Sequence, residues 1–465
     1  HEKGLLVIQD IVPNHVGDYF RFIDGQFELN VDSSPTAAPE QYPFSLNNYE
    51  TDSEKNIYHW TPDISNFNDQ LQKFTYQMSG LDDLNTENPE VIEALKDSYT
   101  FWIREAGIDG FRIDTVIYVP YEFWKEFLKG ENGIYQVANE SGKTGFITFG
   151  EAWVRSDPLS DTGEKVIREF FENGMNSMLD FPLNIELRSI FKEGKPTANL
   201  TYRLEKRSEY FDPSRMLTFV DNHDMERFLK GGGLANLKQA LAFIFTVPGI
   251  PVVYYGTEQG FNETRAAMFA GGFQSGDVDH YNNNSELFKY IQELITLRKN
   301  NPVFRYGTLR VLKDDSNGPG IFAYSLEWEG EKVFVIMNTS GERRILANMD
   351  TGMEMCEVVR PLYAFNSLFK DYTVENDGNL VITMNPRSVY VGVATKEKKS
   401  VTLPDIEFNV DLEDNQKIDS NYTITGSAKG ATSARIIFDT RIEDGKDIEI
   451  IDGKPRKRAK GRVDY

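Results

Sequence analysis

The sequence predicts a parallel α/β fold, and a (β/α)8 barrel is favoured over an open sheet. Two observations support this prediction. Strand-like and helix-like segments alternate over about the first 300 residues, and polar residues cluster where the predicted strands end. In addition, no GxGxxG or GxxxxGK[ST] motif stands at a strand-to-helix turn, which weakens the alternative of a nucleotide-binding open sheet.

Six barrel strands are expected in the chain. They are residues 5–12, 109–116, 146–151, 178–183, 216–220 and 251–255. The first is a nearly continuous apolar run, which is typical of a strand buried on both faces of a parallel sheet. Because a closed barrel needs eight strands, we expect the first two to be missing from this chain and to precede His1.

Helices are expected between these strands, and one long irregular segment interrupts the alternation. The helical segments are residues 88–102, 122–128, 164–173, 185–210 with a break near Pro196, 234–246 and 285–300. Residues 16–80 are rich in Asn, Asp, Ser, Pro and aromatic residues. We interpret this stretch as a loop domain inserted after the third barrel strand, forming a small satellite core or a ligand-facing lid.

After Pro302 the pattern changes to short alternating runs separated by turns. We therefore expect a catalytic barrel in residues 1–301 and a C-terminal all-β sandwich in residues 302–396. A charged linker is expected at residues 396–400. Residues 401–465 are expected to form a partial β-rich accessory segment that ends in a basic tail.

The composition limits the classes of partner. The net charge of −22 argues against nucleic acid or an anionic membrane as a partner and fits a neutral ligand. Five histidines and one cysteine show no zinc-site spacing, and there is no apolar run of about 18 residues for a membrane span. The chain starts at His1 without a signal peptide, so we expect a processed or trimmed N-terminus.

The strand around residues 109–116 carries the first candidate site. Arg112 and Asp114 are two residues apart and therefore project from one face, whereas Phe111, Ile113 and Thr115 are expected to face covering helices. A guanidinium beside a carboxylate keeps it ionised, as an attacking carboxylate requires. An ordinary internal salt bridge would have the same pattern.

Three acidic residues follow different predicted strands. Asp114, Glu151 and Asp224 each stand at or just past a strand end, so a barrel would bring them into one pocket. A charged carboxylate beside a protonated one would suit retaining glycoside hydrolysis, in which the two carboxyl groups lie about 5 Å apart. Binding of a divalent metal for phosphoryl or enolate chemistry is the alternative use.

Six sequence blocks, taken in order, resemble the conserved regions of the α-amylase family, glycoside hydrolase family 13. The four stronger blocks are residues 10–15 (DIVPNH), 110–114 (GFRID), 150–153 (GEAW) and 219–224 (FVDNHD). The two weaker ones are residues 80–85 (GLDDLN) and 249–258 (GIPVVYYGTE). The resemblance extends through the β domain to about residue 396 and does not cover residues 401–465.

The resemblance implies a role for each matching residue. Asp114 would be the nucleophile, Glu151 the general acid and then base, and Asp224 a ligand of the hydroxyls of the reacting sugar. Arg112 would orient Asp114, and His15 and His223 would hydrogen-bond the same sugar. Trp153 would stack on an acceptor-side sugar, with a packed loop aromatic as the alternative.

The resemblance also implies a structural calcium ion between the barrel and the insertion. Asn14 and Asp83 match the usual oxygen ligands, which suits the preference of calcium for hard donors. The competing interpretation is that both side chains hydrogen-bond loop backbone.

The resemblance thus implies a retaining α-glucan hydrolase that cleaves α-1,4-glucosidic bonds of starch, maltooligosaccharides or cyclodextrins, and that is secreted or periplasmic. A transglycosylase of the same family and a non-catalytic glycan-binding protein on the same barrel are the alternatives. Ile117 and Tyr118 occupy positions where many amylases carry Lys-His. This departure leaves recognition on the acceptor side open.

Overall fold

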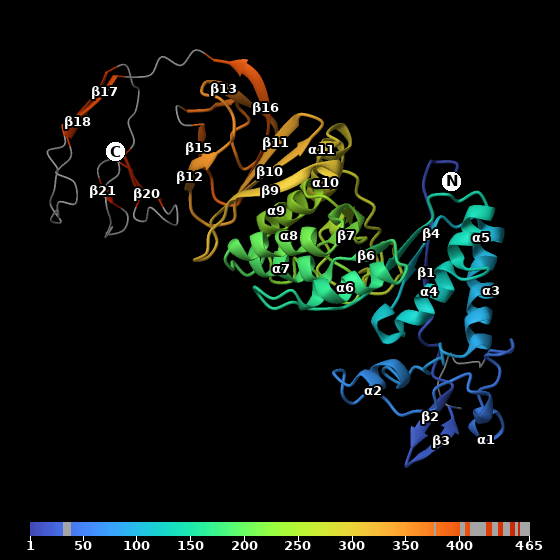
Figure 1. The fold of residues 1–465 in the computed structure, drawn as a ribbon. Coiled ribbons are helices and arrows are strands. Elements are labelled where there is room, and N and C mark those ends of the chain that lie inside the picture. Colours follow the sequence, from blue (N-terminus) through green and yellow to red (C-terminus); the bar gives the residue numbers. More distant parts are fainter. Residues whose placement is uncertain are drawn as a thin grey trace. The chain divides into compact units, whose positions relative to one another are not determined.

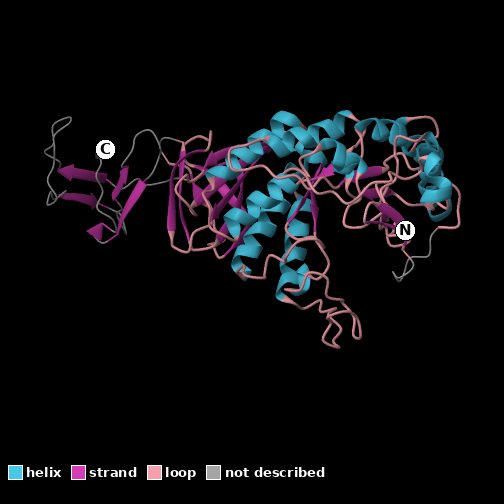
Figure 2. Cartoon of the chain, turned by 90° about the horizontal axis from the view of Figure 1, so that it is seen from below, coloured by secondary structure: helices cyan, strands magenta, loops and turns pink. Residues whose placement is uncertain are grey.

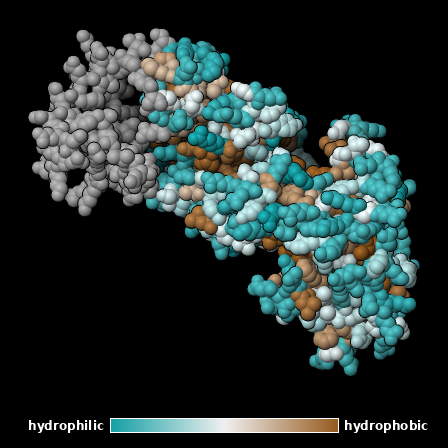
Figure 3. Space-filling view, viewed as in Figure 1, coloured by the Kyte–Doolittle hydropathy of each residue, from teal (hydrophilic) through white to brown (hydrophobic). Residues whose placement is uncertain are grey.

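The computed structural model describes residues 1–30, 39–375 and 378–399, together with five strands further along the chain. The chain divides into two compact units. The first contains His1–Glu193, Asn199–Gly232 and Phe243–Gln292, and the second contains Gly194–Ala198, Gly233–Ala242 and residues from Glu293 onward. On the face drawn in Figure 3, most of the coloured surface is hydrophilic, as expected for a chain with a net charge of −22.

The first unit is built on a six-stranded parallel sheet whose strands lie in sequence order (Figure 1). Its strands are β1 (Ile8–Ile11), β4 (Gly110–Ile113), β5 (Ile147–Gly150), β6 (Ser177–Leu179), β7 (Met216–Phe219) and β8 (Ile250–Val252). All six expected strands are therefore confirmed, and the sheet forms the corresponding part of a (β/α) barrel. Strands β1 and β8 are its two edges.

The first strand is shorter and more exposed than its apolar sequence predicts. Leu5 and Leu6 are 68% and 75% exposed, and β1 begins only at Ile8. The expectation of burial on both faces is wrong because β1 is an edge strand with one neighbour, β4.

Helices follow the strands as expected, with one addition (Figure 2). They are α3 (Pro89–Ala106), α4 (Tyr121–Lys129), α5 (Ile134–Glu140), α6 (Thr162–Glu172), α7 (Phe181–Phe191), α8 (Ala198–Tyr210), α9 (Leu234–Thr246) and α10 (Glu286–Asn300). Helix α5 is the addition, because no helix was expected between residues 128 and 146. In α3, Asn88 accepts a hydrogen bond from the backbone of Glu90, and Gly107 ends the helix at φ 66°. No helix in the described ranges is both long and apolar enough to cross a bilayer.

The insertion after β1 has its own small aromatic core. It contains the hairpin β2 (Phe20–Ile23) and β3 (Gln26–Leu29) and the helices α1 (Tyr49–Asp52), η1 (Ser53–Lys55) and α2 (Gln70–Thr75). Phe20 packs against Trp60 at a ring-centroid distance of 4.3 Å and against Tyr58 at 5.5 Å. Backbone bonds from Val16 to Asp82 and from Leu84 to Asn14 fasten the end of the insertion to the segment that leaves β1.

The second unit consists mainly of antiparallel β-structure, which confirms the expected all-β character after Pro302. One sheet has the order β14 (Tyr372–Thr373), β13 (Glu357–Phe365), β16 (Ser388–Lys398), β11 (Glu331–Asn338), β10 (Ile321–Trp328) and β9 (Thr308–Lys313). The other pairs β12 (Arg344–Asp350) with β15 (Asn379–Met384). Residues of both sheets, among them Phe334 and Ile382, share one hydrophobic core. The short helix α11 (Val303–Tyr306) precedes β9.

The charged residues 396–398 are not a linker. They continue strand β16, and Lys398 is opposite Glu357 in the register with β13. Two ion pairs accompany this pairing: Lys396 contacts Glu357 of β13 at 3.2 Å, and Lys398 contacts Glu354, which precedes β13, at 2.6 Å.

Among the described residues, five short strands follow residue 400. They are β17 (Asp405–Asn409), β18 (Thr425–Lys429), β19 (Ile436–Asp439), β20 (Asp447–Ile451) and β21 (Lys454–Pro455). The basic tail is expected at residues 454–462. Strand β21 contains its first two residues, and the rest of that tail lies outside the described residues.

A fully buried ion pair joins α6 to α8 in the first unit. The guanidinium of Arg203 contacts the carboxylate of Glu164, and both side chains are 0% exposed. Arg203 also donates to the carbonyl of Ser160 at 2.9 Å. Removing one partner leaves the other charge buried and unpaired, whereas replacing both with apolar residues leaves an apolar contact.

Arg203→Met should therefore lower the free energy of unfolding by about 3–5 kcal/mol. The double variant Glu164→Leu/Arg203→Met should recover most of this loss in urea titrations. Lys165→Met, which breaks a pair between the exposed Lys165 and Asp161, the N-cap residue of the same helix, should change stability little. Equal losses in the single and double Arg203 variants would contradict the argument.

Candidate active site

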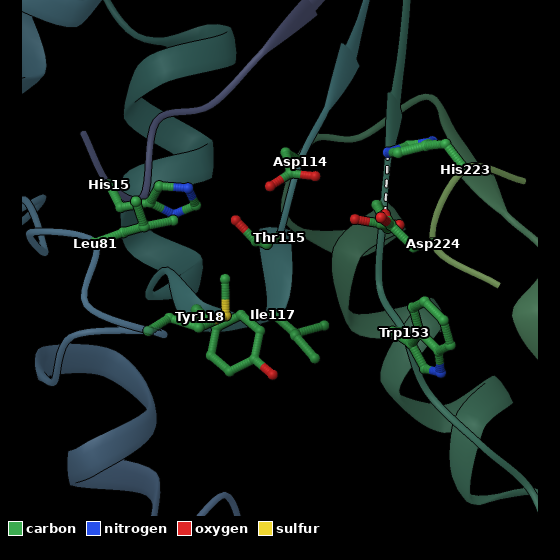
Figure 4. A pocket seen from close by; sticks show the side chains of 11 residues that line it. His15, Leu81, Asp114, Thr115, Ile117, Tyr118, Trp153, His223 and Asp224 are labelled. Atoms are coloured by element: carbon green, nitrogen blue, oxygen red, sulfur yellow. Dashed lines mark ion pairs between the residues drawn. The ribbon is translucent and has the colours of Figure 1, made fainter. Parts of the chain in front are cut away.

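The ends of β4, β5 and β7 bring the three predicted carboxylates into one pocket (Figure 4). Its volume is about 450 Å³. It is lined by His15, Met78, Leu81, Asp114, Thr115, Ile117, Tyr118, Glu151, Trp153, His223 and Asp224. Every predicted substrate-facing residue except Arg112 therefore lines this cavity, and Arg112 contacts two of the lining carboxylates, Asp114 and Glu151.

Arg112 binds several carboxylates at once. Its Nη1 lies 2.5 Å from Asp114 Oδ1 and 2.9 Å from Asp10 Oδ1, and its Nη2 lies 2.8 Å from Glu151 Oε2. The expected same-face geometry of Arg112 and Asp114 is present, but the pairing is not exclusive. One guanidinium therefore holds together the two carboxylates predicted to have opposite roles.

Thr115 does not face the covering helices, as its alternation along the strand predicted. Strand β4 ends at Ile113, and Thr115 has φ 48°, in the left-handed region. A β-branched residue there is strained. The turn directs its side chain into the pocket, and the buried Oγ1 has no hydrogen-bond partner in the described structure.

Glu151 is deeply placed because glycine precedes it. A Cβ at Gly150 would lie 2.9 Å from Val116 Cγ1 and 3.0 Å from Met178 Sδ, so a side chain there would displace the strand end. Burial raises the pKa of Glu151 well above its usual value, and Arg112 partly opposes this shift. A hydrogen bond with Asp114 and the negative charges of Asp114 and Asp224 raise the pKa further.

Asp224 has a cationic partner that sequence reasoning missed. Arg265 Nη2 lies 2.6 Å from Asp224 Oδ1, and Arg265 Nε donates to the carbonyl of His223 at 2.9 Å. His223 Nε2 lies 3.0 Å from Asp224 Oδ2, as the dashed line in Figure 4 marks. Arg265 follows the last sequence block by seven residues, and no local pattern marks it.

His15 and Trp153 both line the pocket from partly packed positions. Burial lowers the pKa of His15, although the charge of Asp114 opposes the shift, so the ring is neutral near pH 7. Trp153 stacks on Phe181 at 5.0 Å with an interplanar angle of 27°, and 46% of the residue stays exposed. Trp153 is thus both a packed aromatic and a pocket wall.

Asn14 and Asp83 lie together but outside this pocket. The carboxylate of Asp83 is 2.7 Å from His59 Nδ1, and the amide nitrogen of Asn14 is 3.3 Å from His15 Nδ1. Burial raises the pKa of Asp83 to about 7, and hydrogen bonds from His59 and Asn14 counteract it. In the described part of the chain, no group of three or more His, Cys, Asp or Glu residues could hold a metal.

A parallel sheet whose strand ends gather three carboxylates is the arrangement of a barrel-type enzyme with an acidic active site. Residues 1–278 match the family model described as the alpha-amylase catalytic domain. The chain belongs to the alpha-amylase family of glycoside hydrolases, which confirms the resemblance found in the sequence.

Several characterised proteins are similar to it. A beta/alpha-amylase from Paenibacillus polymyxa is 28% identical over 408 residues, covering 84% of this chain and 29% of that protein. A cyclomaltodextrin glucanotransferase from Paenibacillus macerans is 31% identical over 317 residues, 66% of this chain and 40% of that protein. The crystal structure of an Anoxybacillus alpha-amylase has a TM-score of 0.67 at 26% identity, covering 86% of this chain and 78% of that chain.

The chain spans only part of the curated relatives it matches. It covers 29% of the beta/alpha-amylase, 57% of a cyclomaltodextrin glucanotransferase from Thermoanaerobacterium thermosulfurigenes and 54% of an alpha-amylase from Streptomyces lividans.

The raised pKa of Glu151 predicts how the stability of the protein depends on pH. Because the folded state holds this proton more tightly than the unfolded chain, wild-type stability should fall as pH rises from roughly pH 5 toward the raised pKa. Glu151→Gln cannot lose a proton. It should therefore gain stability relative to wild type over that window, by at most about 1.4 kcal/mol per pH unit.

Urea titrations at a series of pH values measure this difference. At acidic pH, below the ordinary glutamate pKa, the two proteins should differ by a constant amount. A difference that stays constant up to alkaline pH would show that Glu151 ionises normally.

Proposed function

We propose that this chain carries the active site of a retaining α-glucan hydrolase that cleaves α-1,4-glucosidic bonds of starch, maltooligosaccharides or cyclodextrins. The observation that carries the proposal is the pair formed by Asp114 and Glu151, held by one guanidinium at the wall of an open pocket. The retaining mechanism uses two such carboxyl groups about 5 Å apart.

The reaction proceeds by double displacement. Asp114, held in place by Arg112, attacks the anomeric carbon through a carboxylate oxygen while Glu151 gives its proton to the glycosidic oxygen, and the leaving sugar departs as an alcohol. Glu151, now a carboxylate, takes a proton from water, whose oxygen attacks the anomeric carbon and releases Asp114. The sugar gains a hydroxyl with its original configuration.

The other polar side chains position the reacting sugar. Asp224 accepts hydrogen bonds from sugar hydroxyls, with its orientation held by Arg265. His15 and His223 reach the same sugar from opposite sides of Asp114, as they lie in Figure 4. Positioning of this kind makes the attack effectively unimolecular.

A transglycosylase is the second candidate, and the names of the relatives favour it as much as a hydrolase. Cyclomaltodextrin glucanotransferases and a cyclomaltodextrinase from Thermoanaerobacter pseudethanolicus are similar to the chain at 26–31% identity. The two reactions share every step up to the covalent intermediate and differ in whether water or a sugar hydroxyl attacks it. A glycan-binding protein without activity is less favoured, because Asp114, Glu151 and Asp224 all line the pocket.

Asp114→Asn should lower kcat/KM on maltoheptaose by at least roughly a thousandfold. Asp10→Asn is the matched control, because Asp10 contacts the same Arg112 nitrogen and does not line the pocket. The control should lose less than about tenfold. Comparable losses in both variants would assign the effect to the Arg112 cluster as a whole and remove Asp114 as the nucleophile.

The same incubation resolves the two enzymatic candidates. Products shorter than maltoheptaose alone indicate hydrolysis, and longer ones indicate transfer. Absence of any product from the full chain would overturn both in favour of binding.

We also propose that a calcium ion binds beside Asn14 and Asp83. The donor chemistry fits, because an amide oxygen and a carboxylate are hard ligands, and a cation would compensate the buried charge of Asp83. The two side chains supply few of the six to eight oxygens that calcium takes, so backbone carbonyls and water would supply the rest. The ion would stabilise the junction of the insertion and β1 without taking part in the chemistry.

A chelator should therefore lower the melting temperature, and added calcium should restore it. Asp83→Asn should lose this calcium-dependent increment while retaining the rest of its stability. If neither the chelator nor added calcium changes the melting temperature, no calcium binds at this position, and Asp83 serves only as the hydrogen-bond partner of His59.

A further inference from the structure

A second cavity lies at the opposite ends of the strands that carry the candidate active site. Its volume is about 370 Å³, within the range of small-molecule pockets. Its lining includes Phe146, Asn176 and Arg215, which directly precede β5, β6 and β7. Because these strands are parallel, the cavity lies at their amino ends, whereas Glu151 and Asp224 follow their carboxyl ends. The cavity is therefore separate from the site proposed for glucan cleavage.

The charge of this cavity is opposite to that of the whole chain. Its charged lining residues are Lys129, Lys143 and Arg215, and no acidic residue belongs to the described lining. The chain as a whole has 72 Asp and Glu residues against 50 Lys and Arg. Like charges gathered around one cavity repel each other, so this arrangement is unfavourable unless an anion compensates it.

Among the described residues, only one of the three cations has a carboxylate partner. Lys143 Nζ lies 2.7 Å from Asp109 Oδ1 and donates to the carbonyl of Gly107 at 2.6 Å. Lys129 and Arg215 form no ion pair in the described part of the chain. Three cations and one carboxylate leave two positive charges uncompensated at the cavity.

Arg215 is held in place by contacts within the chain. Its Nε donates to the carbonyl of Asn176 at 2.7 Å, and its Nη2 donates to the carbonyl of Met175 at 3.2 Å. The guanidinium also lies 4.6 Å from the centre of the Phe171 ring, a cation–π contact. Nη1 has no hydrogen-bond partner among the described residues. A ligand that binds this nitrogen therefore meets a pre-organised group, which lowers the entropic cost of binding.

Neutral polar residues accompany the cations. Asn139 and Thr144 belong to the lining, and both are exposed. The hydroxyl of Tyr135 is already engaged, because it donates to the carbonyl of Gly174 at 3.0 Å. An exposed amide and an exposed hydroxyl beside three cations suit a ligand that has hydroxyl groups as well as negative charge.

We propose that this cavity binds a phosphate group, carried either by a small polyol or by the free ion. A phosphate monoester has a charge of about −1.5 to −2 at pH 7, which matches the two uncompensated positive charges. Guanidinium and ammonium groups form charge-assisted hydrogen bonds with phosphate oxygens, whereas a single carboxylate would balance only one of the charges. The proposal does not depend on the proposed function, which uses the other ends of the strands.

Calorimetric titrations of the full chain at fixed ionic strength test this proposal. The probes are glycerol 3-phosphate, inorganic phosphate and, as the neutral control, glycerol. At least one phosphate probe should bind at least about a hundredfold more tightly than glycerol, because two hydrogen bonds between charged groups are gained. Tighter binding of glycerol 3-phosphate than of inorganic phosphate identifies the polyol ester as the ligand class, and equal or weaker binding identifies the free ion.

Lys129→Gln should weaken binding of the phosphate probe at least about tenfold. Lys125→Gln is the matched control, because Lys125 is exposed on the same helix, α4, and does not line the cavity. It should leave the affinity unchanged. Arg215→Gln should weaken binding as Lys129→Gln does. If Arg215→Gln fails to fold because it loses its bonds to backbone carbonyls, the exposed Lys129 still tests the site.

Two results would overturn the proposal. One is that neither phosphate probe binds more tightly than glycerol, and the other is that Lys129→Gln binds the phosphate probe as tightly as Lys125→Gln does. Turnover of maltoheptaose, measured separately, should be the same in Lys129→Gln as in wild type. Failure of the phosphate site and failure of the proposed function are therefore distinguishable.

Discussion

The active site depends on a single guanidinium. Arg112 contacts Asp10, Asp114 and Glu151 within 2.5–2.9 Å. Without a cation, the two pocket carboxylates would repel each other at hydrogen-bonding distance in a partly buried site. The β-strand places Arg112 two residues before Asp114, and the parallel neighbour β5 brings Glu151 to the other side of the guanidinium.

The surrounding fold keeps this cluster both ordered and open. Phe111 and Ile113 are 0% exposed and anchor the opposite face of β4, while Gly150 allows β5 to lie close to Val116 and Met178. Buried packing on one face therefore positions polar chemistry at the strand ends. The insertion supplies Met78 to the pocket, and Leu81 follows directly after it, so the insertion contributes to the wall of the site as well as forming its own aromatic core.

The features that follow from local sequence pattern could be predicted. Apolar runs located all six strands, and the residues at their ends gave the carboxylates that share the pocket. Sequence reasoning missed features set by tertiary structure: the exposure of Leu5 depends on a neighbouring strand, and Arg265 reaches Asp224 across 41 residues. Thr115 was misassigned because alternation was extended past Ile113, where a left-handed turn ends the strand.

The shared guanidinium bears on how Asp114 and Glu151, two similar acids, could take the different roles proposed for them. Both contact Arg112, so the partner cannot be what distinguishes them. The Glu151 side chain is 6% exposed and that of Asp114 is 18% exposed. Burial penalises the charged form of the more enclosed acid, and the negative charges of Asp114 and Asp224 add to that penalty. Depth in the pocket therefore distinguishes the two acids: burial holds the proton on Glu151 more tightly, which suits the proton-donor role proposed for it, whereas Asp114 is the more exposed partner of Arg112.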